Sequence, residues 1–197
     1  MMILASQSAS RRAMLDAARV PHQAMAAGVD EDAMKASLRA EGVGARNLAD
    51  ALAELKATKL SRRHPAELVL GCDTTVALDD GTMLDKAESR DEQRALLRAI
   101  SGQRHRLYSA AVICQGGTAV WRHVDMAAMH VRPLSDAFID SYLDLEWPEI
   151  GGCVGGYRIE GPGAQLFARI EGSHFTILGL PLLPLLDYLR IRGVLSS

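Results

Sequence analysis

The sequence predicts an α/β protein with a mixed β-sheet, and three observations support this fold class. Short apolar runs alternate along the chain with amphipathic helical patterns. The run Leu68–Leu78 (LVLGCDTTVAL) is rich in β-branched and apolar residues, which is typical of a buried strand. Two further strand patterns, at 104–114 and 118–131, flank Gly116-Gly117 and predict a hairpin, so the sheet is expected to be mixed.

The first half of the chain has clear local signals. Residues 2–5 predict a short strand, the polar stretch Ser6–Ser10 a loop, and the segment RRAMLDAA after it a helix. Such a strand-to-helix turn aims free backbone N–H groups beyond the strand end. Apolar residues at helical spacing predict a helix over 47–63, which Pro65 ends.

Turn and capping signals define the second half. Ser89 and Glu92 have the spacing of a capping box and predict a helix through Ile100. The remaining predicted elements are a turn at 79–81, a short strand at 82–84, a helix at 135–145, glycine-interrupted strands within 157–170, a strand at 176–178 and a closing helix at 181–192.

Length and composition indicate one globular domain over residues 1–197. The chain is 48% hydrophobic with a mean hydropathy of +0.02, and a chain of this length buries roughly 70% of its unfolded surface. A net charge of −2 and only 5% aromatic residues disfavour nucleic-acid binding. The longest apolar run, 177–186, is too short to span a membrane, and the three cysteines lack a C-x-x-C pair. We therefore expect a cytoplasmic protein with reduced thiols.

Polar residues cluster where predicted strands end. Ser6, Ser8, Arg11 and Arg12 follow the first strand, and Asp30-Glu31 follow the second. Cations neutralise phosphate oxygens and carboxylates bind Mg²⁺, so this mixture suits a metal-bound polyanion. Asp73 stands out, because a carboxylate in a buried strand costs several kcal/mol unless it is paired or metal-bound.

Ordinary structural roles remain open for the other candidates. The arginine pair and Asp30-Glu31 are also compatible with a solvated surface, and Lys56 with a lysine that extends past an apolar helix face to solvent. The glycine-rich stretch 151–156 lacks the pattern of a P-loop and of a dinucleotide site, which favours a flexible turn.

The motifs taken in order resemble the Maf-type nucleoside triphosphate pyrophosphatases. The resemblance runs from about Ile3 to Arg190, and it depends on order and spacing because each motif is weak alone. The motifs are LAS-x-S at 4–8 with two arginines following, DE at 30–31, LA-x-x-KA at 52–57, DT at 73–74, Lys86, SG-x-x-H at 101–105, GYRIEG at 156–161, GS at 172–173 and GLPL at 179–182.

The resemblance implies hydrolysis of a nucleoside triphosphate between its α- and β-phosphates, with a divalent cation (Mg²⁺ or Mn²⁺). It also implies a curved mixed sheet with two lobes around a nucleotide-binding cleft. By the same resemblance Asp73 is the general base or a metal-bound residue that orients water, and Glu31 is a metal ligand. The implied substrate contacts are phosphate binding by Arg11, Arg12, Lys56 and Lys86, and donors from Ser6 and Ser8.

The chain departs from the family pattern at several positions. Ser10 stands where an arginine is usual, Ala87 where a proline is usual, and Cys153 where a lysine is usual. Glu160 stands where a glutamine is usual, and Glu160 and Cys153 together resemble the residues of the branch that acts on 7-methyl-GTP. Thr74 resembles the residue of the branch that acts on dTTP and UTP. Because an ionised glutamate only accepts hydrogen bonds, Glu160 favours the donor-rich edge of a guanine.

Two functions therefore remain in competition. The first is a nucleotide pyrophosphatase. The second is a non-catalytic nucleotide-binding regulator on the same fold, linked to cell-division control, which the missing lysine at Cys153 favours. The retained Asp73 and Glu31 favour the enzyme. The sequence leaves open whether the protein is a homodimer.

Overall fold

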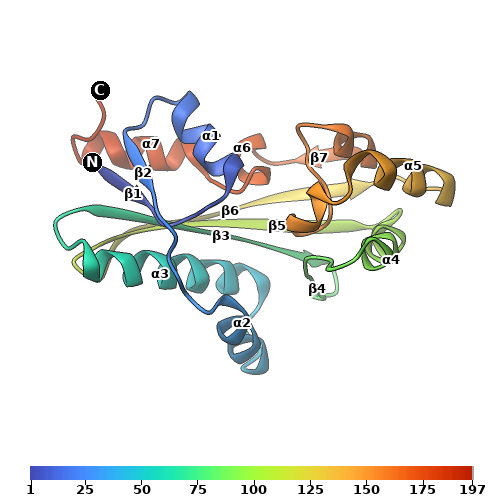
Figure 1. Ribbon diagram of the computed structural model, residues 1–197, viewed down its shortest axis with the longest axis horizontal. Coiled ribbons are helices and arrows are strands. Elements are labelled where there is room, and N and C mark those ends of the chain that lie inside the picture. The colour runs from blue at the N-terminus through green and yellow to red at the C-terminus, as the bar shows by residue number, and fades with distance from the viewer. Residues whose placement is uncertain (197) are drawn as a thin grey trace. The chain divides into compact units, whose positions relative to one another are not determined.

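The computed structural model describes residues 1–196 and confirms the mixed α/β fold (Figure 1). Within these residues the strands form one seven-stranded sheet in the order β2-β1-β3-β5-β6-β7, with β4 paired to β3. β1 is parallel to β2 and β3, whereas β4 is antiparallel to β3 and β7 to β6. The elements are β1 (Met2–Leu4), α1 (Ala9–Ala17), β2 (His22–Ala24), α2 (Glu31–Ala40), α3 (Ala45–Arg63), β3 (Leu68–Leu78), β4 (Met83–Leu84), α4 (Arg90–Ile100), β5 (Arg104–Gln115), β6 (Thr118–Val131), α5 (Asp136–Glu146), η1 (Glu149–Gly152), η2 (Pro162–Leu166), β7 (Phe167–Glu171), α6 (His174–Ile177) and α7 (Leu182–Ile191).

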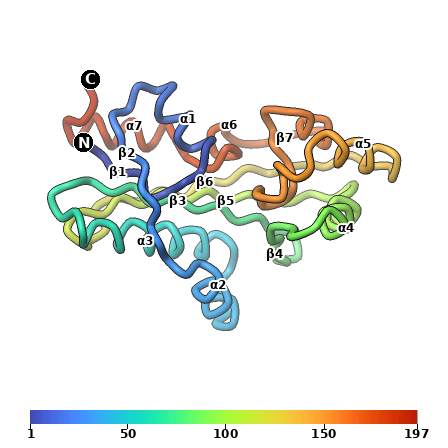
Figure 2. The backbone as a smooth tube through the Cα atoms, in the orientation of Figure 1, coloured from blue at the N-terminus to red at the C-terminus, as the bar shows by residue number. Residues whose placement is uncertain are grey.

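Two predicted elements need correction, and one helix was not predicted. The strand predicted at 176–178 is wrong, because the short helix α6 occupies 174–177. Only the end of the region 157–170 is a strand: Pro162 opens the 3-10 helix η2, and β7 begins at Phe167. The sequence analysis also missed α2, which the chain forms on its way from β2 to α3 (Figure 2).

The chain divides into two compact units. The first contains residues 1–74, 108–125 and 173–196, and the second contains 75–107 and 126–172. The chain passes from one unit to the other within β3, within β5, within β6 and between Gly172 and Ser173. Each unit is described by itself below.

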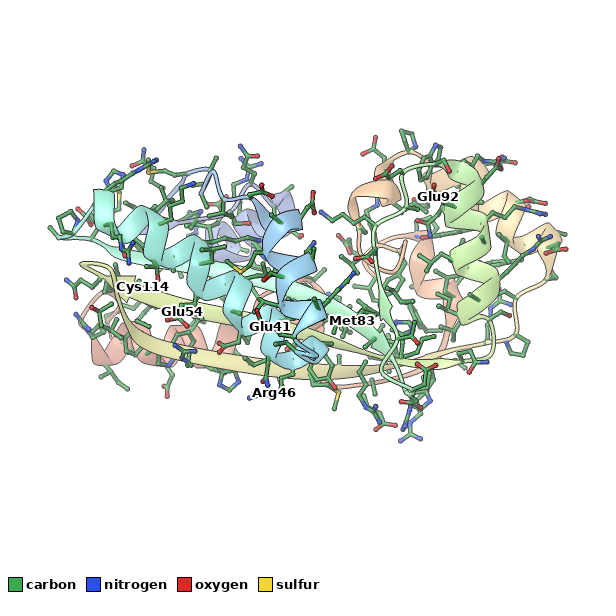
Figure 3. All side chains as sticks on the ribbon, turned by 90° about the horizontal axis from the view of Figure 1, so that it is seen from below. Glu41, Arg46, Glu54, Met83, Glu92 and Cys114 are labelled. Atoms are coloured by element: carbon green, nitrogen blue, oxygen red, sulfur yellow. The ribbon has the colours of Figure 1, made fainter. Side chains whose placement is uncertain are left out.

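The first unit has helices on both faces of its part of the sheet (Figure 1). α1 and α7 pack on one face, where apolar side chains from β1, β3 and β5 form a core with them. α3 lies on the other face and presents the alanines Ala49, Ala53 and Ala57 to β5. Arg122 of β6 forms ion pairs with two acidic residues of α3. Its guanidinium lies 2.6 Å from Asp50 and 2.9 Å from Glu54, which is labelled in Figure 3.

Gly71 of β3 allows α3 to approach the sheet very closely. A Cβ atom at this position would lie 2.0 Å from the carbonyl oxygen of Ala53 and 2.8 Å from the amide nitrogen of Ala57. The backbones of strand and helix are therefore in contact at this point. The close approach also brings two polar residues near each other. Lys56 adjoins Ala57 on the helix, and Asp73 lies two residues after Gly71 on the strand.

In the second unit α4 and α5 are joined by a ladder of ion pairs. Arg94 donates to both oxygens of Asp140 at 2.6 and 2.8 Å, and Arg98 donates to Asp136 at 2.8 Å. A third pair joins Arg90 and Asp144. The arginines recur every fourth residue and so do the aspartates, so the two helices match in antiparallel register. The predicted cap of α4 is confirmed: the Ser89 hydroxyl accepts a hydrogen bond from the Glu92 amide at 3.2 Å.

None of the helices formed by residues 1–196 is both long enough and apolar enough to cross a membrane.

The close approach at Gly71 gives a stability prediction. We expect Gly71→Ala to destabilise the protein by about 3 kcal/mol, because overpacking a tight contact costs roughly 1–3 kcal/mol or more and the neighbouring atoms here belong to the backbone. Urea unfolding followed by circular dichroism measures the change. The matched control is Gly152→Ala, whose Cβ would meet no atom within 4 Å. Equal stability of the two variants would contradict the argument.

Candidate functional site

The alternation of β3 directs the Asp73 carboxylate toward α3. Leu68, Leu70 and Cys72 belong to the core on the α1 and α7 face, whereas Val69 packs on the opposite face. Asp73 has the parity of Val69, and a strand points successive side chains to opposite faces. Its carboxylate accordingly meets Lys56 of α3, with Lys56 Nζ 2.7 Å from Asp73 Oδ1.

Lys56 has all three of its ammonium donors engaged. Besides Asp73, its Nζ lies 2.9 Å from Glu31 Oε2 and 3.5 Å from the carbonyl oxygen of Cys72. Lys56 and Asp73 are only 7% and 6% exposed. Breaking such a buried pair by removing one partner costs roughly 3–5 kcal/mol, so each charge holds the other in place.

One oxygen of Asp73 has no hydrogen-bond partner among residues 1–196. Asp73 Oδ2 is buried and accepts no hydrogen bond from the described residues. An unsatisfied buried acceptor on a charged group is costly, and such atoms call for a ligand, a water or a catalytic role. Asp73 Oδ2 is therefore the atom of this site that is available to a water proton or to a cation.

The residues present fit a divalent cation that shares its ligands with a substrate. Among residues 1–196, no group of three or more His, Cys, Asp or Glu is arranged to hold a metal ion by itself. Mg²⁺ characteristically uses one or two carboxylates together with waters and phosphate oxygens. Asp73 Oδ2 and the half-exposed Glu31 offer such a pair of carboxylates around one ammonium group.

Glu31 is positioned by the start of α2. Asp30 is the N-cap of that helix, and its Oδ1 accepts a hydrogen bond from the Ala33 amide at 3.0 Å. Of the two acidic residues predicted together, Asp30 thus caps the helix and Glu31 reaches Lys56. A carboxylate in the first helical turn is also favoured by the helix dipole.

The serine loop before α1 is ordered by its own hydroxyl groups. Ser8 is the N-cap and accepts from the Arg11 amide at 3.4 Å, while its own amide donates to Ser6 Oγ at 3.2 Å. The Ser10 hydroxyl lies 3.1 Å from that of Ser8. The predicted loop is confirmed for Ser6–Ser8, but α1 begins at Ala9, two residues earlier than predicted, so Ser10 lies within the helix. Contact between these serines and a substrate stays a prediction.

The two adjacent arginines have different surroundings. Arg11 is partly buried and donates to Ser6, to Thr74 and to the backbone oxygens of Cys72 and Gly179. The exposed Arg12 pairs with no carboxylate in the described part of the chain. Arg12 is thus the arginine whose guanidinium is available to an external anion.

The second unit brings its own predicted residues near one another. Lys86 and Glu160 are both exposed and both lie close enough to Cys153 to act on its thiol. Burial raises the pKa of that thiol, Glu160 raises it further, and Lys86 lowers it. Cys153 is thus a partly buried thiol that stays protonated at neutral pH. How Lys86 and Glu160 act with Asp73 stays a prediction.

Several residues with no role assigned from the sequence hold the loop that carries Glu160. Glu146 is buried and receives two hydrogen bonds from Arg158, at 3.0 and 3.2 Å, and Tyr142 donates to the Gly156 carbonyl at 3.2 Å. His105 Nε2 lies 2.8 Å from the Tyr157 hydroxyl. Burial, with a smaller effect of His130, lowers the pKa of His105 to about 4, so this ring is neutral at pH 7.

The buried Asp73–Lys56 pair and the half-exposed Glu31, on a mixed α/β sheet, have the composition of a site for a polyanion and a divalent cation. Residues 1–191 match the model of a family described as "Maf-like protein". The chain belongs to that family, as its ordered motifs predict.

Relatives of this chain are similar over almost their full length. A protein of Sphingopyxis alaskensis is 52% identical over 98% of both chains, and one of Caulobacter vibrioides is 49% identical over 98% of this chain and 96% of its own. One of Ruegeria pomeroyi is 46% identical over 100% of this chain and 98% of its own. All three are named "Nucleoside triphosphate pyrophosphatase". A solved structure of a HAM1 protein from Coxiella burnetii has a TM-score of 0.45 and 12% identity, over 66% of this chain and 72% of that chain.

Proposed function

We propose that this protein hydrolyses nucleoside triphosphates to the monophosphate and pyrophosphate. The observation that carries the proposal is the buried Asp73 carboxylate, with one oxygen held by Lys56 and the other without a partner. Membership of the Maf-like family supports it, as do the names of relatives at 46–52% identity.

Asp73 activates the attacking water in this mechanism. Its Oδ2 accepts a proton from the water, whose oxygen attacks the α-phosphorus while the bond from that phosphorus to the bridging oxygen breaks. Pyrophosphate leaves with the electron pair of that bond. Lys56 fixes the carboxylate through Oδ1, so that Oδ2 keeps one orientation. A divalent cation held by Asp73 and Glu31 would supply positive charge to the phosphate oxygens.

Cationic side chains neutralise the departing pyrophosphate. Arg12 and Lys86 are exposed and suit this role, which for phosphoryl chemistry consists mainly of positioning and charge stabilisation. Lys56 can bind a phosphate oxygen only by releasing one of its present acceptors. Glu31 is the exchangeable one, because its side chain is 40% exposed whereas that of Asp73 is 8% exposed. Residues 1–197 act as one Maf-like domain in this proposal.

A cytoplasmic location fits the thiols. Cys72, Cys114 and Cys153 are free, and the first two are buried. Burial raises the pKa of Cys72 to about 11, so that its thiol stays protonated and unreactive at neutral pH.

The reaction class is tested by product analysis. We expect pyrophosphate release from a panel of ordinary and 7-methylated nucleoside triphosphates, and loss of that release with EDTA, because the two carboxylates need a cation to face phosphate oxygens. Ion chromatography measures pyrophosphate and orthophosphate separately. Tight nucleotide binding without pyrophosphate release would instead support the regulator that the replacement of a lysine by Cys153 suggests. Orthophosphate as the sole product would contradict the proposed bond cleavage.

Replacing Asp73 tests the assignment of the base. We expect Asp73→Asn to lower kcat by roughly 10²-fold or more, because the amide keeps the size of the side chain but accepts no proton at neutral pH. Initial rates of pyrophosphate release and nucleotide binding should be measured together. The matched control is Asp144→Asn, which alters an exposed aspartate of the second unit. Wild-type turnover by Asp73→Asn would remove Asp73 from the mechanism.

We further propose a preference for guanine or a methylated guanine. Glu160 is exposed, and an ionised carboxylate accepts hydrogen bonds from guanine N1–H and N2–H₂, whereas a glutamine offers both a donor and an acceptor. A hydrogen bond to a charged acceptor is worth roughly 1.5–3 kcal/mol, or about 10- to 150-fold.

Glu160→Gln is therefore expected to lower kcat/KM for guanine triphosphates by about 10- to 150-fold and to spare UTP and dTTP. Lys86→Ala is the contrasting variant, because loss of a phosphate contact should weaken every nucleotide alike. Competition kinetics with GTP and UTP give the ratio directly. An unchanged guanine-to-pyrimidine ratio in Glu160→Gln would mean that this residue does not read the base.

A further inference from the structure

Arg11 donates hydrogen bonds to the protein from all three nitrogens of its guanidinium. Its Nε donates to the Gly179 carbonyl at 2.8 Å, and its Nη1 to the Cys72 carbonyl at 3.1 Å and to Ser6 Oγ at 3.2 Å. Its Nη2 donates to Thr74 Oγ1 at 3.0 Å. Four of the five guanidinium N–H groups are therefore engaged, and in the described residues all four acceptors are neutral.

Two of these contacts are to the residues on either side of Asp73, and none is to its carboxylate. Cys72 and Thr74 are its neighbours in the chain, so the fork of Arg11 holds β3 on both sides of it. Thr74 has the parity of Cys72, which faces α1 and α7, whereas the Asp73 carboxylate faces α3. Arg11 thus binds β3 from the face opposite to the reactive oxygen.

The hydrogen bond from Arg11 to Thr74 continues into a chain of hydrogen bonds between hydroxyl groups. In this chain only one assignment of donors and acceptors is possible. Thr74 Oγ1 lies 3.1 Å from Ser109 Oγ, which donates to the Thr176 carbonyl at 2.7 Å. Because a guanidinium only donates and a carbonyl only accepts, Thr74 must give its proton to Ser109. Every proton from Arg11 to the Thr176 carbonyl is thereby assigned.

Glycine at position 179 leaves the space for this arrangement. Gly179 has φ +96°, and a Cβ there would lie 3.2 Å from both Arg11 Nε and Thr74 Oγ1. The glycine of the GLPL motif therefore gives Arg11 direct access to a backbone oxygen. A lysine at position 11 would have a single side-chain nitrogen and could not reproduce the bonds that Arg11 makes from three nitrogens.

We propose that Arg11 and the fully buried Ser109 are positioning residues for Asp73, and that Arg12 is the arginine that binds phosphate. The proposal rests on the hydrolysis proposed above and refines it. Arg11 holds the Cys72 backbone carbonyl on one side of the base and the Thr74 hydroxyl on the other, and Ser109 binds the Thr74 hydroxyl in turn. Displacement of a catalytic group by about 1 Å can cost on the order of 10²-fold in rate.

The test compares charge-preserving and charge-removing variants by two readouts. Turnover is followed as pyrophosphate release, and binding as the Kd of α,β-methylene-GTP by calorimetry. We expect Arg11→Lys and Ser109→Ala to lower kcat about 10- to 100-fold and to change Kd less than about threefold. Arg12→Ala should raise Kd about 10- to 150-fold. Arg63→Lys, at the exposed end of α3, is the control for a conservative arginine change.

Two further measurements separate positioning from a general loss of structure. Rates are expressed per folded protein, well below the Tm of each variant, and Ser109→Thr, which keeps the hydroxyl, should recover part of the turnover lost in Ser109→Ala. Wild-type kcat in Arg11→Lys or in Ser109→Ala overturns the proposal, and so does an Arg11→Ala variant that weakens binding as strongly as Arg12→Ala. Absence of pyrophosphate release in the wild type would refute the proposed function instead, and the Kd comparison would still decide which arginine binds the analogue.

Discussion

The buried ion pair between Lys56 and Asp73 is the constraint on which the rest of the site depends. Both charged side chains are almost completely buried. The free-energy cost of desolvating each charge is offset only while the other stays within hydrogen-bond distance. This requires α3 to lie against β3 at backbone contact, which Gly71 and the facing alanines make possible. The small residues of this interface thus make the buried ion pair possible as well as the packing.

The pair is also incomplete, and that incompleteness is what makes it suitable for catalysis. Lys56 satisfies one oxygen of Asp73 and leaves the other buried without a partner. A fully satisfied carboxylate would be a better structural element and a poorer base, because a proton or a cation would have to displace a protein donor. Strained or unsatisfied groups of this kind persist where the surrounding structure enforces them.

The sequence predicted much of the fold, and its errors have identifiable physical causes. The apolar run of β3 and the N-cap signal at Ser89 are strong local signals, and the predicted strand and helix are both confirmed, although the Glu92 side chain accepts from the Glu88 amide rather than from that of Ser89. α2 has no fully buried residue, and only the partly buried Met34 and Leu38, four residues apart, mark its apolar face, which is a weak signal in a helix of ten residues. The β-branched residues Thr176 and Ile177 suggested a strand, but they form the four-residue helix α6, which ends before Gly179 at positive φ. Elements this short are decided by tertiary contacts rather than by propensity.

The site was predicted as a set of residue types, whereas the division of roles within it depends on direction. Successive residues point about 100° apart on a helix and to opposite faces on a strand, so neighbours in sequence seldom share an environment. Arg11 and Arg12 illustrate the first case, and Asp73 and Thr74 the second. Asp73 turns to the charged groups of α3, while Thr74 turns to a neutral hydrogen-bond chain that ends on a backbone carbonyl. Two adjacent polar residues of one motif therefore have different partners, one a charged group and the other a neutral hydrogen-bond chain. That distinction becomes visible only when the three-dimensional neighbours of each side chain are known.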